Sequence, residues 1–102
     1  MIRHIVLTKF KQKTDESEIE EIYAGLSELV DKLPGAQNFT GGRSKSPEQI
    51  ERGYLHGFVI DFDTWDDLET YAHHPEHKAL GSRMIDRSTG GLDGILVLDL
   101  EV

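Results

Sequence analysis

The stretch Gly53-Tyr54-Leu55-His56-Gly57-Phe58-Val59-Ile60-Asp61-Phe62 decides the fold of this chain. Every second position in it carries a large side chain: Tyr54, His56, Phe58, Ile60 and Phe62. Successive side chains of a β-strand point to opposite faces of a sheet, so this alternation predicts a strand over residues 54–62. One face of that strand is expected to be buried, and the neighbouring elements must cover it.

The residues before this strand predict a first strand and an amphipathic helix. Residues 2–11 begin with a β-branched and aliphatic run that is typical of a strand. Thr14 and Asp15 then offer an N-cap, and Glu18 stands three residues after Asp15, as in a capping box. The apolar residues that follow recur at three- and four-residue steps and form one stripe: Ile19, Ile22, Tyr23, Leu26, Leu29, Val30 and Leu33. The segment Leu33-Pro34-Gly35 ends the helix.

The remaining segments complete a regular order of elements. A weaker strand over 36–43 and a polar loop over 44–53 connect the helix to the strand at 54–62. Thr64 caps a short helix, and Pro75 breaks it because its ring would clash with the carbonyl of Tyr71. A second short helix begins at Pro75. A flexible stretch over 88–91 then leads to a last strand over 95–102.

The order βαββαβ, in one domain over residues 1–102, predicts an α+β fold of the ferredoxin-like type. In this arrangement a four-stranded antiparallel sheet carries helical segments on one face only. Alternation places Ile5, Leu7, Leu55 and Val59 on the bare face. We expect a second copy of the chain to cover it, because a two-fold contact lets one patch complement itself.

The composition argues against several classes of partner. The formal net charge is -8, with 11 Lys and Arg scattered among 19 Asp and Glu, so binding to nucleic acid or to an anionic membrane surface is disfavoured. The chain has no cysteine, hence no disulfide and no thiolate nucleophile. No apolar run approaches the ~20 residues that span a bilayer, and no signal-peptide core is present. We therefore expect a cytoplasmic protein.

Two segments resemble a known family. Residues 53–59 resemble the third strand of the stress-responsive dimeric α/β-barrel (Dabb) domain, and residues 71–77, Tyr-Ala-His-His-Pro-Glu-His, resemble its Tyr-x-x-His-Pro-x-His segment. The resemblance covers the whole chain. It implies a ferredoxin-like protomer and a homodimer whose two sheets pack into a barrel. Members include plant stress-associated proteins, plant polyketide cyclases that close a ring by aldol condensation, and bacterial domains without assigned activity.

The resemblance also implies a set of site residues. In the cyclases a Tyr and the second His of the motif carry the reaction, and the matching residues here are Tyr71 and His77. His4 and His56 match further histidines of the same pocket. To these ligand-binding candidates we add two residues, Tyr23 and His74.

A neutral His77 beside the Tyr71 hydroxyl would form a cofactor-free acid–base pair. His77 lies in the first turn of its helix, where the positive end of the helix dipole disfavours a protonated ring. It could remove a proton α to a carbonyl while Tyr71 donates a hydrogen bond to the developing enolate. Alternatively, the side chains of His77 and Tyr71 only fill the interface between helix and sheet, with their polar atoms hydrogen-bonded there. His4 and His56 both occupy positions of their strands that face the helices. There they either orient a ligand or form a mutually hydrogen-bonded pair.

We expect neither a metal nor an organic cofactor. His73, His74 and His77 are close in sequence, but Pro75 interrupts the helix that would align them. Three interpretations remain open: a small, partly apolar ligand with a cyclase-like proton transfer, a non-enzymatic stress-associated role, and a cofactor-independent, monooxygenase-like activity. A cavity of about 300 Å³ or more beside His77 would favour ligand binding, and a filled interior would favour the structural role.

Overall fold

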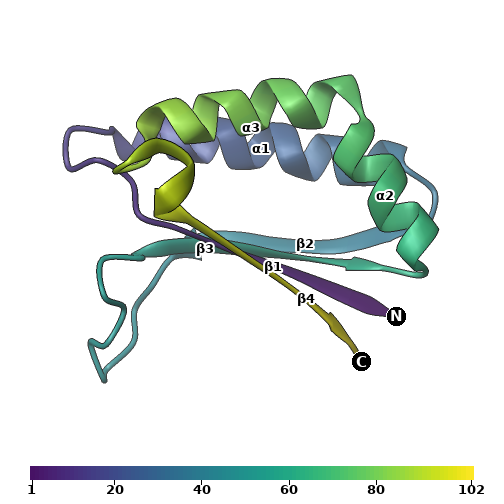
Figure 1. Ribbon diagram of the computed structural model, residues 1–102, viewed down its shortest axis with the longest axis horizontal. Helices are drawn as coiled ribbons and strands as arrows, with labels where there is room; N and C mark the ends of the chain where they lie inside the picture. The colour runs from purple at the N-terminus through teal and green to yellow at the C-terminus, as the bar shows by residue number, and fades with distance from the viewer.

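A four-stranded antiparallel sheet forms one layer of the computed structural model, which describes residues 1–102 (Figure 1). The strands are β1 (Ile2–Thr8), β2 (Ala36–Arg43), β3 (His56–Phe62) and β4 (Ile95–Glu101), in the spatial order β2-β3-β1-β4. The helices α1 (Glu16–Lys32), α2 (Trp65–His73) and α3 (Pro75–Arg87) lie together on one side, and a 3₁₀ turn, η1 (Gly91–Gly94), precedes β4. The predicted ferredoxin-like α+β fold is therefore confirmed.

Local sequence signals set most of the helix boundaries. Gly35 follows α1 with φ +81°, a backbone conformation that favours glycine. Thr64 caps α2, since its Oγ1 accepts a hydrogen bond from the Asp67 N–H at 3.2 Å. Pro75 is the first residue of α3, and the ring of His74 caps this helix by accepting the Glu76 N–H at 3.1 Å. The break predicted at Pro75 thus separates α2 from α3.

The capping box predicted at the start of α1 does not form. Asp15 is the N-cap residue, but its side chain makes no capping hydrogen bond. The Glu18 carboxylate instead accepts a hydrogen bond from Arg87 Nε at 2.8 Å. An ion pair to the end of α3 takes Glu18 away from its own helix, so tertiary packing overrides the local signal.

The first and third strands are shorter than predicted, and the segment before β4 is more ordered. β1 ends at Thr8, after which Lys9 pairs through its backbone with Gly94 and Thr89, at 2.8 Å each. β3 begins at His56 rather than at residue 54. Ser88, which we placed in a flexible stretch, is fully buried, and its hydroxyl donates to the Met84 carbonyl at 2.6 Å. The chain between α3 and β4 is therefore held by Lys9, the residue that follows β1.

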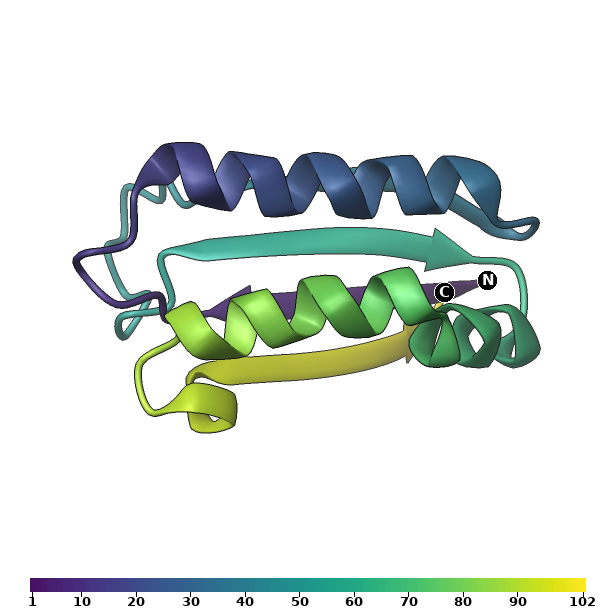
Figure 2. The ribbon, with the colours of Figure 1, turned by 90° about the horizontal axis from the view of Figure 1, so that it is seen from above.

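The hydrophobic core fills the space between the sheet and the helices. It contains 13 buried apolar residues, and α1 supplies six of them: Ile19, Ile22, Tyr23, Leu26, Leu29 and Val30. Figure 2 shows α1 on the β2 side of the sheet, with α3 on the β4 side. Burial of one such side chain stabilises the fold by roughly 1.5–3 kcal/mol, so the stripe of α1 holds much of this layer together.

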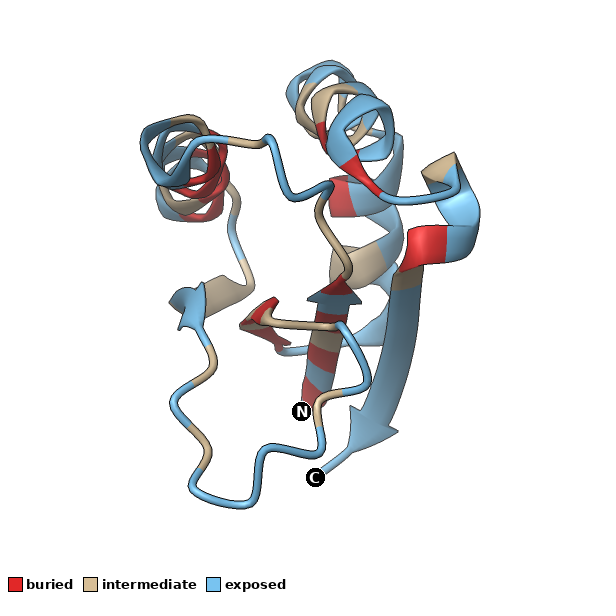
Figure 3. Cartoon of the chain, turned by 90° about the vertical axis from the view of Figure 1, so that its left-hand side faces the viewer, coloured by how far each residue is buried: buried red, intermediate tan, exposed pale blue.

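The two faces of the sheet differ sharply in exposure. Along β1 the residues Ile2, His4, Val6 and Thr8 are buried beneath the helices, whereas the alternate residues are not. Figure 3 shows the same banding, with β4 exposed along most of its length. The bare face carries three of the four predicted apolar residues, because Leu55 precedes β3 and lines a different hollow with Phe10 and Ile19. It also carries three exposed leucines of β4 that the sequence analysis missed: Leu96, Leu98 and Leu100. Their two-residue spacing could have revealed them.

None of the helices has the length and apolar character needed to cross a bilayer.

Gly94→Ala should destabilise the protein, because a Cβ there would lie 2.4 Å from the Thr89 carbonyl oxygen. We expect a loss of roughly 2 kcal/mol or more in the free energy of unfolding, measured by urea denaturation, as for other overpacked sites. Gly81→Ala in α3 is the control, because its added Cβ meets nothing within 4 Å apart from its chain neighbours and the backbone of its own helix. That variant should gain about 0.5–1 kcal/mol from helix propensity. Equal stability of the two variants would contradict this account.

Candidate functional site

A cavity of about 200 Å³ lies between the sheet and the α2–α3 pair. Apolar side chains make up most of its wall, and three residues bring polar rings to it, namely His4, Tyr71 and His77. On α3, Gly81 also lines the cavity and leaves room where a side chain would stand. The volume is below the ~300 Å³ at which ligand pockets usually begin, yet the interior is not filled. This cavity, which we call the Tyr71 cavity, therefore matches neither of the two outcomes set out above.

Tyr71 lies near the end of α2 and is completely buried, and its hydroxyl has no hydrogen-bond partner. Its ring lies 4.4 Å from that of His77 and 5.8 Å from that of His4, between centroids. Burial raises the pKa of Tyr71 above its ordinary value, so the hydroxyl keeps its proton at neutral pH. A buried hydroxyl without a partner costs about 1–3 kcal/mol, which a ligand that accepts its hydrogen bond would recover.

His77 presents a neutral imidazole to the same cavity. Its Nδ1 lies 3.0 Å from the carbonyl oxygen of Ala72 and donates to it, so the lone pair of the neutral ring is at Nε2. Burial lowers the pKa of His77 below its ordinary value, against the opposing effect of this hydrogen bond. We predicted a neutral ring on account of the helix dipole, and the structure supports that state through burial.

An acidic residue that the sequence analysis missed holds His4 in place. Asp99 lies directly opposite His4 in the pairing of β1 with β4, and its Oδ1 is 2.6 Å from His4 Nδ1. The contact fixes His4 with Nδ1–H donating to the carboxylate. The available signal was an aspartate at a helix-facing position of a strand that otherwise alternates leucine and valine.

His56 does not line the Tyr71 cavity, so the single cavity that we predicted for it with His4, Tyr71 and His77 is not present. Tyr23 and His74 do not line this cavity either. His4 and His56 lie on opposite sides of the paired residues Val6 and Phe58, and they form no mutual hydrogen bond. The alternation of side chains along each strand correctly placed both rings on the helix side of the sheet, but it does not specify how far apart they lie.

The other candidates occupy distinct places. His56 Nε2 contacts both oxygens of Glu16, at 3.1 and 3.0 Å, and Tyr23 lines a hollow with these two residues. His74 caps α3, and the exposed His73 lies 3.9 Å from Glu69. No group of three or more histidine or carboxylate side chains converges closely enough to hold a metal ion.

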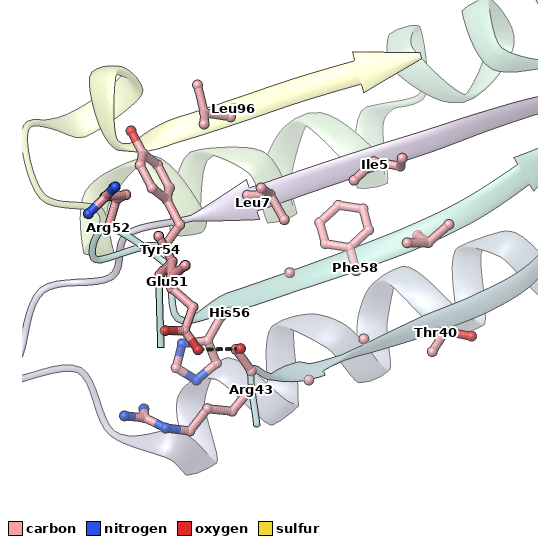
Figure 4. A pocket seen from close by; sticks show the side chains of 16 residues that line it. Ile5, Leu7, Thr40, Arg43, Glu51, Arg52, Tyr54, His56, Phe58 and Leu96 are labelled. Carbon is pink, nitrogen blue, oxygen red and sulfur yellow. Dashed lines mark hydrogen bonds between the residues drawn. The ribbon is translucent and has the colours of Figure 1, made fainter. Parts of the chain in front are cut away.

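The bare face of the sheet is hollowed where the loop over residues 44–55 rises beside it. This hollow measures about 710 Å³, and Figure 4 shows Ile5, Leu7 and Leu96 along its floor, with Arg52 and Tyr54 at its rim. The floor is part of the apolar face described above. Its size and wide opening match a surface for another protein better than an enclosed ligand site.

Comparison with known proteins finds relatives along the whole chain. A model of the family described as the stress responsive A/B barrel domain (Dabb) matches residues 2–102. The stress-response A/B barrel domain-containing protein HS1 of Arabidopsis thaliana is 30% identical over 98 residues, covering 96% of this chain and 86% of that protein. Olivetolic acid cyclase of Cannabis sativa is 26% identical over 80 residues, covering 78% of this chain and 79% of the cyclase.

Solved structures show the same similarity. A dimeric ferredoxin-like protein of unknown function from Jannaschia sp. CCS1 superimposes with a TM-score of 0.93 at 35% identity, covering 99% of this chain and 98% of that one. Hydroxynitrile lyase from Passiflora edulis has a TM-score of 0.84 at 20% identity, covering 99% and 92%. The second similarity is one of fold alone.

His77 should titrate below its ordinary pKa of 6.5. Because its pKa is lowered only in the folded state, the unfolded chain binds more protons between the folded pKa and 6.5. The free energy of unfolding should therefore fall as the pH decreases through that window, and His77→Gln should remove this part of the fall. An NMR titration of the His77 ring proton, with urea unfolding at several pH values, measures both effects. A midpoint at or above 6.5 is the contradicting result.

Proposed function

The chain belongs to the stress responsive A/B barrel domain (Dabb) family, and on that premise we propose a homodimer that binds a small, partly apolar molecule in the Tyr71 cavity. We propose further that the cavity supports a proton transfer without a cofactor. One observation carries this proposal: the buried Tyr71 hydroxyl lacks a partner beside a neutral His77 and an unfilled space. An unsatisfied polar group in such a place is typical of a functional site.

The three rings have separable roles in this mechanism. His77 Nε2 is the base that removes a proton from a carbon next to a carbonyl, because its Nδ1 is engaged with Ala72. Tyr71 keeps its proton and donates a hydrogen bond to the enolate oxygen that develops. His4, held by Asp99, leaves its Nε2 to accept a hydrogen bond from the substrate. Asp99 is thus a positioning residue, which acts through His4.

The walls of the cavity define the ligand class. They are mostly apolar, so they favour a short hydrocarbon chain or ring with one polar reacting centre. The Tyr71 hydroxyl is closed off from water, so a bound carbonyl reaches it only when the wall side chains shift slightly. A β-dicarbonyl compound or its thioester meets these requirements, because its α-proton is acidic enough for an imidazole. The similarity to a cyclase of Cannabis sativa supports this class.

The dimer is proposed from the bare face of the sheet. Leu7, Leu96, Leu98 and Leu100 are all more than one-third exposed on one side of the molecule. A stable contact buries about 800 Å² on each partner, an area on the scale of one sheet face. Related structures from Jannaschia sp. and Thermobifida fusca are described as dimeric. A second copy is therefore the occupant that we propose for this face.

A structural role without catalysis is the second candidate, and the modest volume of the cavity favours it. In that case Tyr71 and His77 serve only to pack α2 and α3 against the sheet. The two candidates differ in what they predict for the same variants.

If the cavity is catalytic, His77→Ala and Tyr71→Phe should each lower turnover of a β-dicarbonyl thioester by roughly 10²-fold or more, the usual contribution of a positioned acid or base. Gly81→Leu is the matched steric variant, because it fills the cavity and removes no polar group. It should abolish binding of the thioester while the fold remains intact. Calorimetry and a turnover assay measure these effects.

A purely structural role gives the opposite pattern. His77→Ala should then lower stability by about 1–3 kcal/mol, with no binding to lose in any variant. That outcome, measured by thermal unfolding, would exclude the enzymatic proposal.

Val59→Asp should dissociate the dimer, because it would bury an unpaired charge in the contact between two sheets. Sedimentation velocity at micromolar concentration should show a dimer for the native protein and a monomer for this variant. Leu92→Asp is the control, since Leu92 is 68% exposed on η1, away from the sheet face. It should remain dimeric. A folded native monomer would contradict the proposal.

A further inference from the structure

The bare face of the sheet carries a regular grid of side chains. Residues directly opposite each other in paired strands point to the same face, so the strand register defines rows that run across the sheet. In the spatial order β2-β3-β1-β4 there are three such rows: Gly42, Gly57, Leu7 and Leu96; Thr40, Val59, Ile5 and Leu98; Gln37, Asp61, Arg3 and Leu100. Each row has four positions, two on each side of the line between β3 and β1.

The two sides of this grid differ in height. In the first row β2 and β3 carry glycines, whereas β1 and β4 carry leucines (Figure 4). A Cβ added at Gly42 would meet no atom within 4 Å apart from its chain neighbours, and the glycine end of this row lies in the hollow of about 710 Å³. On β4, Leu96 and Leu98 are 46% and 55% exposed. The face is therefore hollowed on the β2–β3 side and raised on the β1–β4 side.

The third row places a charged pair on this otherwise apolar face. Arg3 Nε donates to Asp61 Oδ1 at 2.9 Å, and the amide of Asn38 donates to Asp61 Oδ2 at 3.3 Å. Asp61 is buried, but the Arg3 side chain is 44% exposed, and its Nη1 has no hydrogen-bond partner within the chain. Covering such a cation is costly unless the covering surface supplies an acceptor.

Two copies can pack face to face about a two-fold axis in only two principal orientations. The axis lies in the plane between the sheets, and the strands of packed sheets are aligned to within about 30°. An axis parallel to the strands, between β1 and β3, sets β2 opposite the partner's β4 and β3 opposite the partner's β1. An axis across the strands sets each strand opposite itself and reverses the order of the rows.

The axis across the strands would match unlike surfaces poorly. Leu98 would meet the partner's Leu98, so the raised sides would collide while the hollowed sides enclosed empty space. Arg3 would meet the partner's Leu7, which offers no acceptor to its free Nη1. The axis parallel to the strands removes both conflicts, because each small residue then lies opposite a large one and each cation opposite an anion.

We propose that the dimer has its two-fold axis parallel to β1 and β3, with the partner's Leu96 filling the space at Gly42 and with Arg3 binding the partner's Asp61. This inference rests on the dimer proposed above and adds the residues that make the face accept a second copy of this chain. Symmetry repeats each contact, so four side chains form a ring of alternating charge at the axis. A related domain with apolar residues at the positions of Arg3 and Asp61 would leave this chain's charges unpaired, so the ring selects for self-association.

The first test exchanges the leucine and the glycine, with dimer dissociation measured by sedimentation equilibrium on the full chain. Gly42→Leu should weaken association about tenfold or more, because its side chain blocks the partner's Leu96. Adding Leu96→Ala should restore the affinity to within about threefold of the native value. Within one chain Gly42 and Leu96 are three strand spacings apart, about 14 Å, so this rescue can act only between subunits.

Leu98→Ala added to Gly42→Leu is the matched control, because Leu98 lies in the neighbouring row of the same strand. It should give no rescue. A native dimer in which the Leu96 and Leu98 combinations behave alike would overturn the proposed orientation and leave the dimer itself standing. A native monomer would overturn both. Thermal unfolding verifies that the Gly42→Leu protein is folded, as the open space at this position leads us to expect.

The second test concerns the ring of charges. Arg3→Glu and Asp61→Lys should each be monomeric alone, because four like charges would meet at the axis, and an equimolar mixture should form a heterodimer. Native mass spectrometry distinguishes the two species. Lys13→Glu is the control: it makes the same charge change at an exposed residue outside the sheet, and it should remain a homodimer. Folded variants that stay monomeric when mixed would overturn the charge contact, since a pair that acts only within one chain gives no heterodimer.

Discussion

The antiparallel register that sets Val6 opposite Phe58 is the constraint on which the rest of this structure depends. It places two imidazole rings, His4 and His56, on the covered face of the sheet, where each needs a hydrogen-bonding partner. Their partners come from the flanking elements: Asp99 on β4 and Glu16 on α1. The chemistry of both halves of the molecule follows from satisfying these two rings.

The sequence predicts the fold better than it predicts the site, and single residues show why. Alternation over 54–62 and the stripe of α1 are local patterns that burial imposes directly, so strands and helices could be placed from them. Alternation along each strand indicates which face of the sheet carries His4 and His56. The distance between them depends on the pairing register of the two strands, which no local pattern encodes. Asp15 and Glu18 matched a capping signal, yet Arg87 from a distant helix captures Glu18. Partners that are far apart in sequence decide such contacts.

The two halves differ because Pro75 interrupts only one of the helical layers. Under the continuous helix α1 six buried residues pack against the sheet. Under α2 and α3 the chain changes direction at His74 and Pro75, and Gly81 leaves space beneath it. A glycine within a helix and an unpaired tyrosine hydroxyl both lower stability. Their joint presence beside one cavity is a local departure from the best-packed structure, of the kind that functional sites maintain.

Strand β4 has a consequence for how the molecule responds to its own concentration. Asp99, which positions His4, lies between Leu98 and Leu100, whose side chains point to the opposite face. In the proposed dimer one short strand therefore belongs to the ligand site on one side and to the subunit contact on the other. Thermodynamic linkage makes any coupling through this strand reciprocal: if a ligand strengthens association, association raises the affinity for that ligand by the same factor. Dilution of the protein would then lower its affinity for the ligand, so the protein's own concentration would determine how much ligand is needed to occupy the site.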